Sequence, residues 1–199
     1  MKKYYPFIIY LAISVAIPII IRQFLVTDLV IENKIESNEI YSRISLDIEG
    51  IKLSKTFHYF IEMLIVFFDF LIVLGIVIGV FKAFSESYKS YQILNIISEG
   101  YLIFLLGYLL KILYFMLLDD FSIDRFENYT ILSLADFYNY EDVGKFKYLM
   151  FSNYNLFRLS SLIFITYSIY KITNEKIKIS IILFLIIGAI YFLPPLIGI

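Results

Sequence analysis

The chain has 199 residues, 60% of them hydrophobic, with a formal net charge of −1 and a mean hydropathy of +0.81. Soluble domains are about 45–50% apolar, so this excess of apolar surface predicts a protein surrounded by lipid, and the near-neutral charge does not favour a nucleic-acid partner. The lack of cysteine excludes disulfides and thiolate sites, and the single histidine excludes a two-histidine zinc protease motif.

The first predicted membrane span covers residues 5–26 and follows two lysines. No charged side chain lies between Tyr4 and Ile21. A signal peptide is the alternative, because Ser14-Val15-Ala16 resembles a small-residue cleavage site. The apolar run continues past Ala16, longer than the roughly 7–15 residues of a signal h-region, and this favours a span.

The second predicted span, residues 57–81, is long and apolar enough to cross a bilayer yet carries two carboxylates, Glu62 and Asp69. At about 100° per residue, His58, Glu62 and Asp69 fall on one stripe of a helix. We therefore expect this span to be a buried central helix around which the others pack.

Three more spans follow, and two polar loops separate the spans on one side. The predicted third, fourth and fifth spans are residues 93–118, 149–170 and 179–199, and the polar loops are residues 27–56 and 119–148. Within the second loop, residues 131–138 are apolar enough to lie in the membrane interface as a short helix. The sequence thus predicts a single membrane domain over residues 1–199, an all-α polytopic bundle with five transmembrane helices.

Lysines in the short segments predict the orientation. They are Lys2 and Lys3, Lys82 and Lys89, and Lys171, Lys176 and Lys178. Five spans place these three groups on one side and the acid-rich loops on the other. The positive-inside rule then predicts a multi-pass protein of the inner (plasma) membrane, with its N-terminus in the cytoplasm and its C-terminus outside.

Four charged side chains fall at similar depth on three neighbouring predicted spans: Glu62, Asp69, Lys111 and Arg158. A charge at the bilayer centre costs about 2.5–3.5 kcal/mol on insertion scales, so we expect these groups to form an intramembrane polar cluster. One interpretation is an ion or proton path, or a polar pocket for a substrate headgroup. The other is that the pairs only fix helix order and register. Glu99 lies nearer the inner surface, where its side chain can reach water.

Four glycines are candidates for close helix packing: Gly75, Gly79, Gly100 and Gly107. Gly75 and Gly79 form a small-xxx-small motif on a stripe away from the carboxylates, which would let another helix approach closely. Gly100 and Gly107 share a stripe with Lys111.

The sequence contains no recognisable enzyme signature. Gly-x-Ser-x-Gly, H-E-x-x-H and Walker motifs are absent. His58 and Glu62 lie one turn apart, but two ligands are too few for a metal site, and a histidine that forms hydrogen bonds at the interface is the better interpretation. We therefore predict no catalytic residues, no metal and no cofactor.

Three stretches of the C-terminal half carry a family resemblance: Ile131–Phe137 (Ile-Leu-Ser-Leu-Ala-Asp-Phe), Asn155–Leu159 (Asn-Leu-Phe-Arg-Leu) and Tyr167–Ile172 (Tyr-Ser-Ile-Tyr-Lys-Ile). Together they resemble bacterial members of the Yip-type family, five-span membrane proteins named for eukaryotic relatives that interact with Rab GTPases. The stretches Tyr91–Leu94 and Leu110–Ile112 are similar to the third-span region of flavobacterial members. The resemblance covers about half of the chain. It implies five spans, a cytoplasmic N-terminus and no known catalytic residues.

These observations predict a non-enzymatic membrane protein that acts as a scaffold or as an accessory subunit of a membrane complex. Its expected partners are membrane lipids and either further copies of itself or other membrane-protein subunits, with no nucleic acid. A small transporter or channel subunit that uses the acid/base cluster is the alternative.

Overall fold

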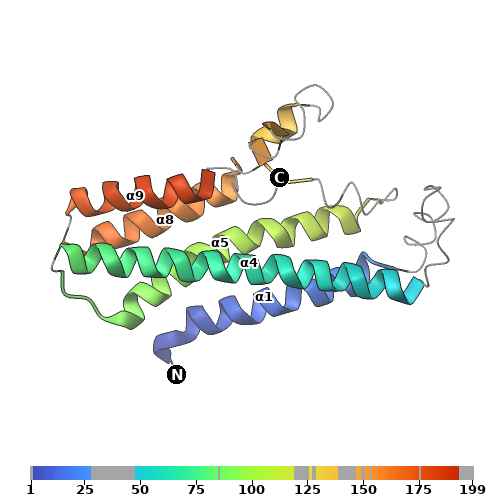
Figure 1. Ribbon diagram of the computed structural model, residues 1–199, viewed down its shortest axis with the longest axis horizontal. Coiled ribbons are helices and arrows are strands. Elements are labelled where there is room, and N and C mark those ends of the chain that lie inside the picture. Colours follow the sequence, from blue (N-terminus) through green and yellow to red (C-terminus); the bar gives the residue numbers. More distant parts are fainter. Residues whose placement is uncertain are drawn as a thin grey trace.

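The computed structural model describes residues 2–27, 48–84, 86–118, 126, 129–138, 147–148, 151–152, 154–174 and 176–192. Within these ranges the chain is an all-α bundle, which confirms the predicted fold class (Figure 1). Its long helices are α1 (Tyr5–Phe24), α4 (Ile48–Ala83), α5 (Ser90–Met116), α8 (Leu156–Ile172) and α9 (Ile177–Phe192). Two short 3-10 helices, η1 (Lys2–Tyr4) and η2 (Leu134–Phe137), complete the described elements.

The apolar helices make this a membrane-embedded protein. Among the described residues, α1, the Leu53–Ala83 part of α4, and α5 are each long and apolar enough to cross a membrane. Helix α9 is equally apolar in character but has only 16 residues. Helix α8, with 17 residues, contains Arg158 and several hydroxyl side chains and is the least apolar of the five.

The central helix is α5 rather than α4. Helix α5 packs closely against α1 and α8 and more lightly against α4, so the expectation of a central second span is wrong. The reason lies on the outer face of α4, where large apolar side chains such as Phe57, Ile65 and Phe68 are 57–66% exposed. In a bilayer these side chains can face acyl chains, so the apolar outer face of α4 need not be covered by protein.

Two helix boundaries differ from the sequence prediction. Helix α4 begins at Ile48, nine residues before the predicted start of the second span, because the helix continues through polar residues that contain no proline. Helix α8 begins at Leu156 instead of residue 149, because Asn155 caps it. Of the predicted short helix at residues 131–138, only Leu134–Phe137 is helical, as the 3-10 helix η2. Helix α9 is described to Phe192, and residues 193–199 lie outside the described part.

Aromatic rings in stacked and edge-on contacts fill the core where α1, α4 and α5 meet. The ring of Phe70 lies 4.9 Å from that of Tyr10 and 5.4 Å from that of Tyr101, and all three side chains are buried. Tyr101 in turn meets the ring of Tyr191 from α9 edge-on at 6.3 Å. Aromatic pairs at these distances add about 0.5–1.5 kcal/mol each beyond their buried area, so this chain of rings ties four helices together.

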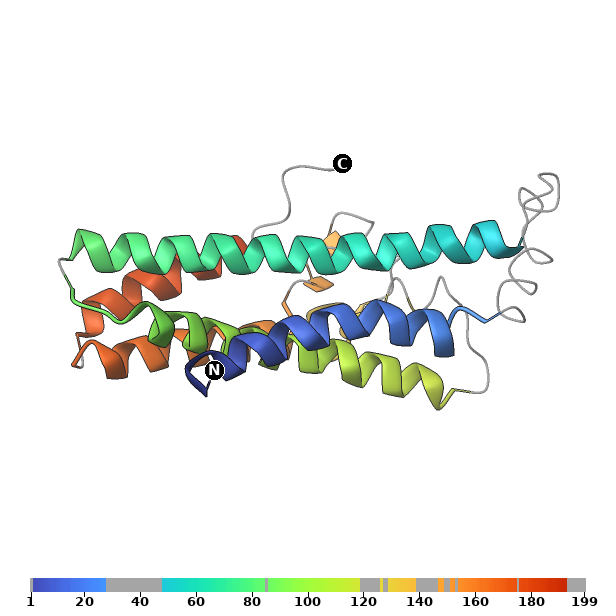
Figure 2. The ribbon, with the colours of Figure 1, turned by 90° about the horizontal axis from the view of Figure 1, so that it is seen from below.

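The short connections gather at one end of the bundle (Figure 2). The side-chain amide of Asn95 donates to the Lys3 carbonyl (2.8 Å), and the Lys3 ammonium lies over the Tyr91 ring. At the same end, Lys176 in the α8–α9 turn forms an ion pair with Glu86 in the α4–α5 connection. The three basic groups therefore lie on the same side of the bundle, as the span count requires.

Gly100 and Gly107 lie where α5 crosses α8. A Cβ atom at Gly100 would stand 2.7 Å from Ile165 Cδ1, and one at Gly107 would stand 2.8 Å from Phe157 Cδ2. Neither position can hold a side chain unless the Ile165 or Phe157 side chain of α8 shifts. By contrast, a Cβ at Gly75 or Gly79 would meet no described atom within 4 Å.

Candidate functional site

The start of α8 positions Arg158, and a small bridge to the preceding loop fixes that start. The Asn155 side-chain oxygen accepts the backbone N–H of Arg158 at 2.8 Å, an N-cap worth about 1 kcal/mol. Asn155 also pairs with Ser133 in an isolated antiparallel bridge, and Leu156 N–H donates to the Leu132 carbonyl at 3.0 Å. The loop at residues 131–138 therefore holds the first turn of α8 in place.

The Arg158 guanidinium joins three helices. Its Nη1 donates to the Tyr191 carbonyl in the last turn of α9 at 3.2 Å, and its Cζ lies 5.2 Å from the centre of the Phe104 ring of α5. A helix C-terminus is negatively polarised, and an aromatic face attracts cations, so both contacts stabilise a positive charge inside the bundle.

Asp69 shares a small cavity with Arg158. The cavity has a volume of about 30 Å³. Its lining residues are Asp69, Tyr101, Phe104, Arg158, Ile190 and Tyr191. The helices thus bring together two of the four charges that we predicted to cluster, one from α4 and one from α8.

Two tyrosines, Tyr101 and Tyr191, line this cavity. Tyr101 Oη is buried and has no hydrogen-bond partner among the described residues. Unsatisfied buried hydroxyls are unfavourable, and a polar space of this size admits about one water molecule. The cavity is therefore suited to hold a water between the tyrosine hydroxyls and the side chains of Asp69 and Arg158.

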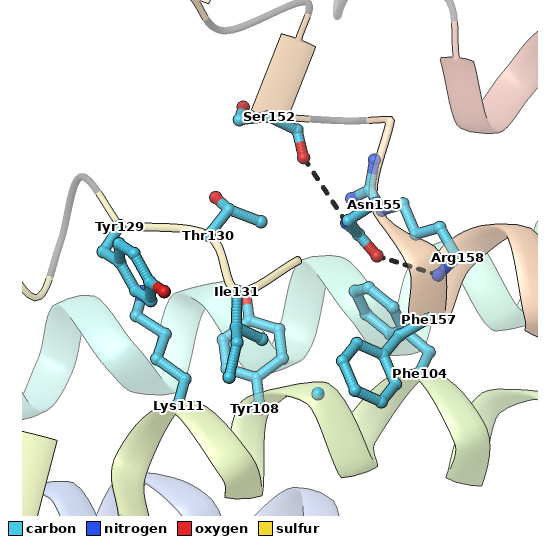
Figure 3. A pocket seen from close by; sticks show the side chains of 11 residues that line it. Phe104, Tyr108, Lys111, Tyr129, Thr130, Ile131, Ser152, Asn155, Phe157 and Arg158 are labelled. Atoms are coloured by element: carbon cyan, nitrogen blue, oxygen red, sulfur yellow. Dashed lines mark hydrogen bonds between the residues drawn. The ribbon is translucent and has the colours of Figure 1, made fainter. Parts of the chain in front are cut away.

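A larger pocket of about 170 Å³ lies beside it and contains Arg158 and Lys111 (Figure 3). Lys111 extends from α5 and Arg158 from α8, at opposite ends of the pocket. The Lys111 ammonium also lies 4.4 Å from the centre of the Phe126 ring. The remaining lining residues are Phe104, Gly107, Tyr108, Tyr129, Thr130, Ile131, Ser152, Asn155 and Phe157.

Glu62, the fourth predicted member of the cluster, lines neither cavity. Its Oε1 lies 3.5 Å from His58 Nε2 one turn earlier on α4, and both side chains are substantially exposed. Within the described ranges, no three histidine, aspartate or glutamate side chains come together in a way that could hold a metal ion. The His58–Glu62 contact is therefore a local one between neighbouring turns of α4.

Sequence reasoning missed the uncharged members of both cavities. Tyr101, Tyr108 and Tyr191 lie among 18 tyrosines, and nothing in the pattern distinguishes them from interfacial aromatics. Asn155 did carry a signal, since an Asn three residues before Arg158 and directly before an apolar run is typical of an N-cap.

Comparisons with protein-family models, with curated proteins and with solved structures find no match for this chain. The resemblance to the Yip-type family therefore stays a prediction.

Proposed function

We propose that this chain is a non-enzymatic integral membrane protein that acts as a scaffold or accessory subunit, and that it associates through the outer face of α4. The observation behind the proposal is the open space at Gly75 and Gly79. Small residues on an uncovered transmembrane helix let a second helix approach closely, and close approach is what drives association inside lipid.

The spacing of the exposed residues on α4 also supports this face as a helix–helix contact surface, which we call the α4 seam. Ile61, Ile65, Phe68 and Ile72 are 40–60% exposed. Their spacing of four, three and four residues continues to Gly75 and Gly79. Such alternation keeps one stripe of a helix against a partner over several turns.

Cysteine cross-linking tests the proposal, because the natural chain has no cysteine. Ile72→Cys on the seam should give a disulfide-linked dimer, or a disulfide to a second subunit, in native membranes. Leu113→Cys, at a 55% exposed site on α5, is the control and should give neither. The mass of the native protein in nanodiscs should then correspond to an oligomer or a complex, and Gly79→Leu should dissociate it. A strictly monomeric protein with no co-purifying partner and no cross-link at position 72 would refute the proposal.

We further propose that the basic end of the bundle faces the cytoplasm of a bacterial cell, with the C-terminus outside. The clustering of Lys3, Lys176 and the other basic residues of the short segments supports this orientation. Phe137→Cys should react with a membrane-impermeant maleimide in intact cells, and Lys178→Cys should react only after permeabilisation. The reverse pattern would invert the topology.

A small transporter or channel subunit is the second candidate, and the cavity shared by Asp69 and Arg158 favours it. Intramembrane ionisable groups often mark ion or proton paths. In liposomes, this function predicts a proton or ion flux that Asp69→Asn abolishes and that Glu99→Gln, a change at an exposed α5 carboxylate, leaves intact. If the wild-type protein carries no flux, this candidate is removed.

A further inference from the structure

Unequal helix lengths leave a step in the bundle at the end away from the short connections. At about 1.5 Å per residue, α8 and α9 are roughly 24–26 Å long, whereas α5 is roughly 40 Å long. Figure 1 shows α8 and α9 stopping well short of α4 and α5 at this end. The loop at residues 129–138 lies over the step, and both the Lys111–Arg158 pocket and a second, apolar groove open there.

Two basic side chains line the pocket. Lys111 and Arg158 line it together with the hydroxyl side chains of Tyr108, Tyr129 and Thr130, and its described lining includes no carboxylate. Asn155 and Arg158 place the N-terminal turn of α8 beside the same space, and the positive end of that helix dipole adds to the potential. Two cations, a helix N-terminus and several hydroxyl donors suit a phosphate group.

The groove is apolar and adjoins the pocket through Asn155, which lines both. Its volume is about 550 Å³, within the range of small-molecule sites. Its other lining residues are Leu132, Ser133, Leu134, Asp136, Phe137, Tyr154, Leu156, Leu159 and Phe192. Leu132 has a positive φ of 52°, and its side chain stays 54% exposed beside the groove.

We propose that this step binds one anionic phospholipid, with its headgroup in the pocket that Lys111 and Arg158 line and one acyl chain along the groove. Charge complementarity selects the ligand, since an apolar peptide or a second copy of α4 offers no anion to the two cations. Basic pockets between transmembrane helices are suited to anionic headgroups, and each buried CH₂ group of an acyl chain adds to binding. The site lies apart from the α4 seam, and it shares Arg158 with the cavity of the transporter candidate.

The preference of the protein for an anionic lipid tests the proposed site. The full-length protein is placed in nanodiscs of equimolar phosphatidylglycerol and phosphatidylcholine, and the lipids that remain bound are identified by native mass spectrometry. We expect a preference for phosphatidylglycerol that Lys111→Gln lowers about fivefold, the effect of one basic side chain near an anionic headgroup. Lys178→Gln removes the same charge from an exposed site at the opposite end and should leave the preference unchanged.

The test also includes a folding check and a competition with a soluble phosphate ester. Circular dichroism checks that Lys111→Gln folds, and Thr130→Glu, which introduces an anion from the loop, replaces that variant if it does not. Equal retention of the two lipids by the wild type, or an unchanged preference in the pocket variant, overturns the proposal. Displacement of the lipid by millimolar glycerol phosphate also overturns it, because the site would then take a free phosphate ester.

Discussion

Substitution of Gly100 by alanine tests the α5–α8 contact that fixes the position of the polar cavities. The new Cβ would stand 2.7 Å from Ile165 Cδ1, where ordinary carbon contacts are about 3.5–4.0 Å. Ile165 is fully buried, so its side chain has no free space into which to move. Overpacking of this kind typically destabilises by about 1–3 kcal/mol.

The net change is smaller, because alanine is favoured over glycine in a helix by about 1 kcal/mol. We therefore expect Gly100→Ala to lower the free energy of unfolding by about 0–2 kcal/mol. In an Ile165→Ala background the clash is gone, and the same substitution should raise stability by about 1 kcal/mol. The difference between the two backgrounds isolates the steric contribution, about 1–3 kcal/mol.

The assay is unfolding in mixed micelles with increasing sodium dodecyl sulfate, followed by circular dichroism. Gly79→Ala is the matched control, because its Cβ meets no described atom within 4 Å and only helix propensity changes. If Gly100→Ala stabilises the protein as much as Gly79→Ala does, and equally in both backgrounds, the close approach of α5 and α8 is refuted.

The other predictions use the same titration. Asn155→Ala should lower stability by about 1–2 kcal/mol, because it removes the N-cap of α8, whereas an effect below a few tenths of a kcal/mol would mean that the cap is not formed. Lys176→Ala should lower stability by less than about 1 kcal/mol, because its pair with Glu86 is at the surface, and the loss should shrink further in high salt. Asp69→Asn and Arg158→Gln should be non-additive, with a coupling of about 0.5–3 kcal/mol, since the two side chains line one cavity; additive effects would argue against any interaction.

Apolar periodicity and length were enough to predict the helical class and the five helix positions. They were not enough to predict helix order in the bundle. The second span, α4, was expected at the centre because it carries two carboxylates in an apolar run, but in lipid an apolar side chain has little preference for protein over acyl chain. Small residues allow helices to pack closely, so they indicate the central helix better than apolar character does. Here Gly100 and Gly107 indicated α5.

Charge spacing predicted part of the site. Depth arguments placed Asp69, Lys111 and Arg158 near one another, and the structure puts Arg158 in a cavity with each of the other two. They could not exclude Glu62, which shares a stripe of α4 with Asp69 but lies two turns earlier along the helix and lines neither cavity. The apolar groove was also beyond prediction, since it depends on where α8 begins, and a single Asn sets that start.

Helix α4 has a consequence for the space outside the membrane. Its 36 residues give a rod of about 54 Å, longer than the roughly 40–45 Å of a bilayer that includes its headgroups. Unless α4 tilts steeply, one of its ends extends about 10 Å beyond the headgroups into the aqueous phase as a rigid helix. A partner in the aqueous phase on that side could contact Gly50 and its helical neighbours without touching the bilayer.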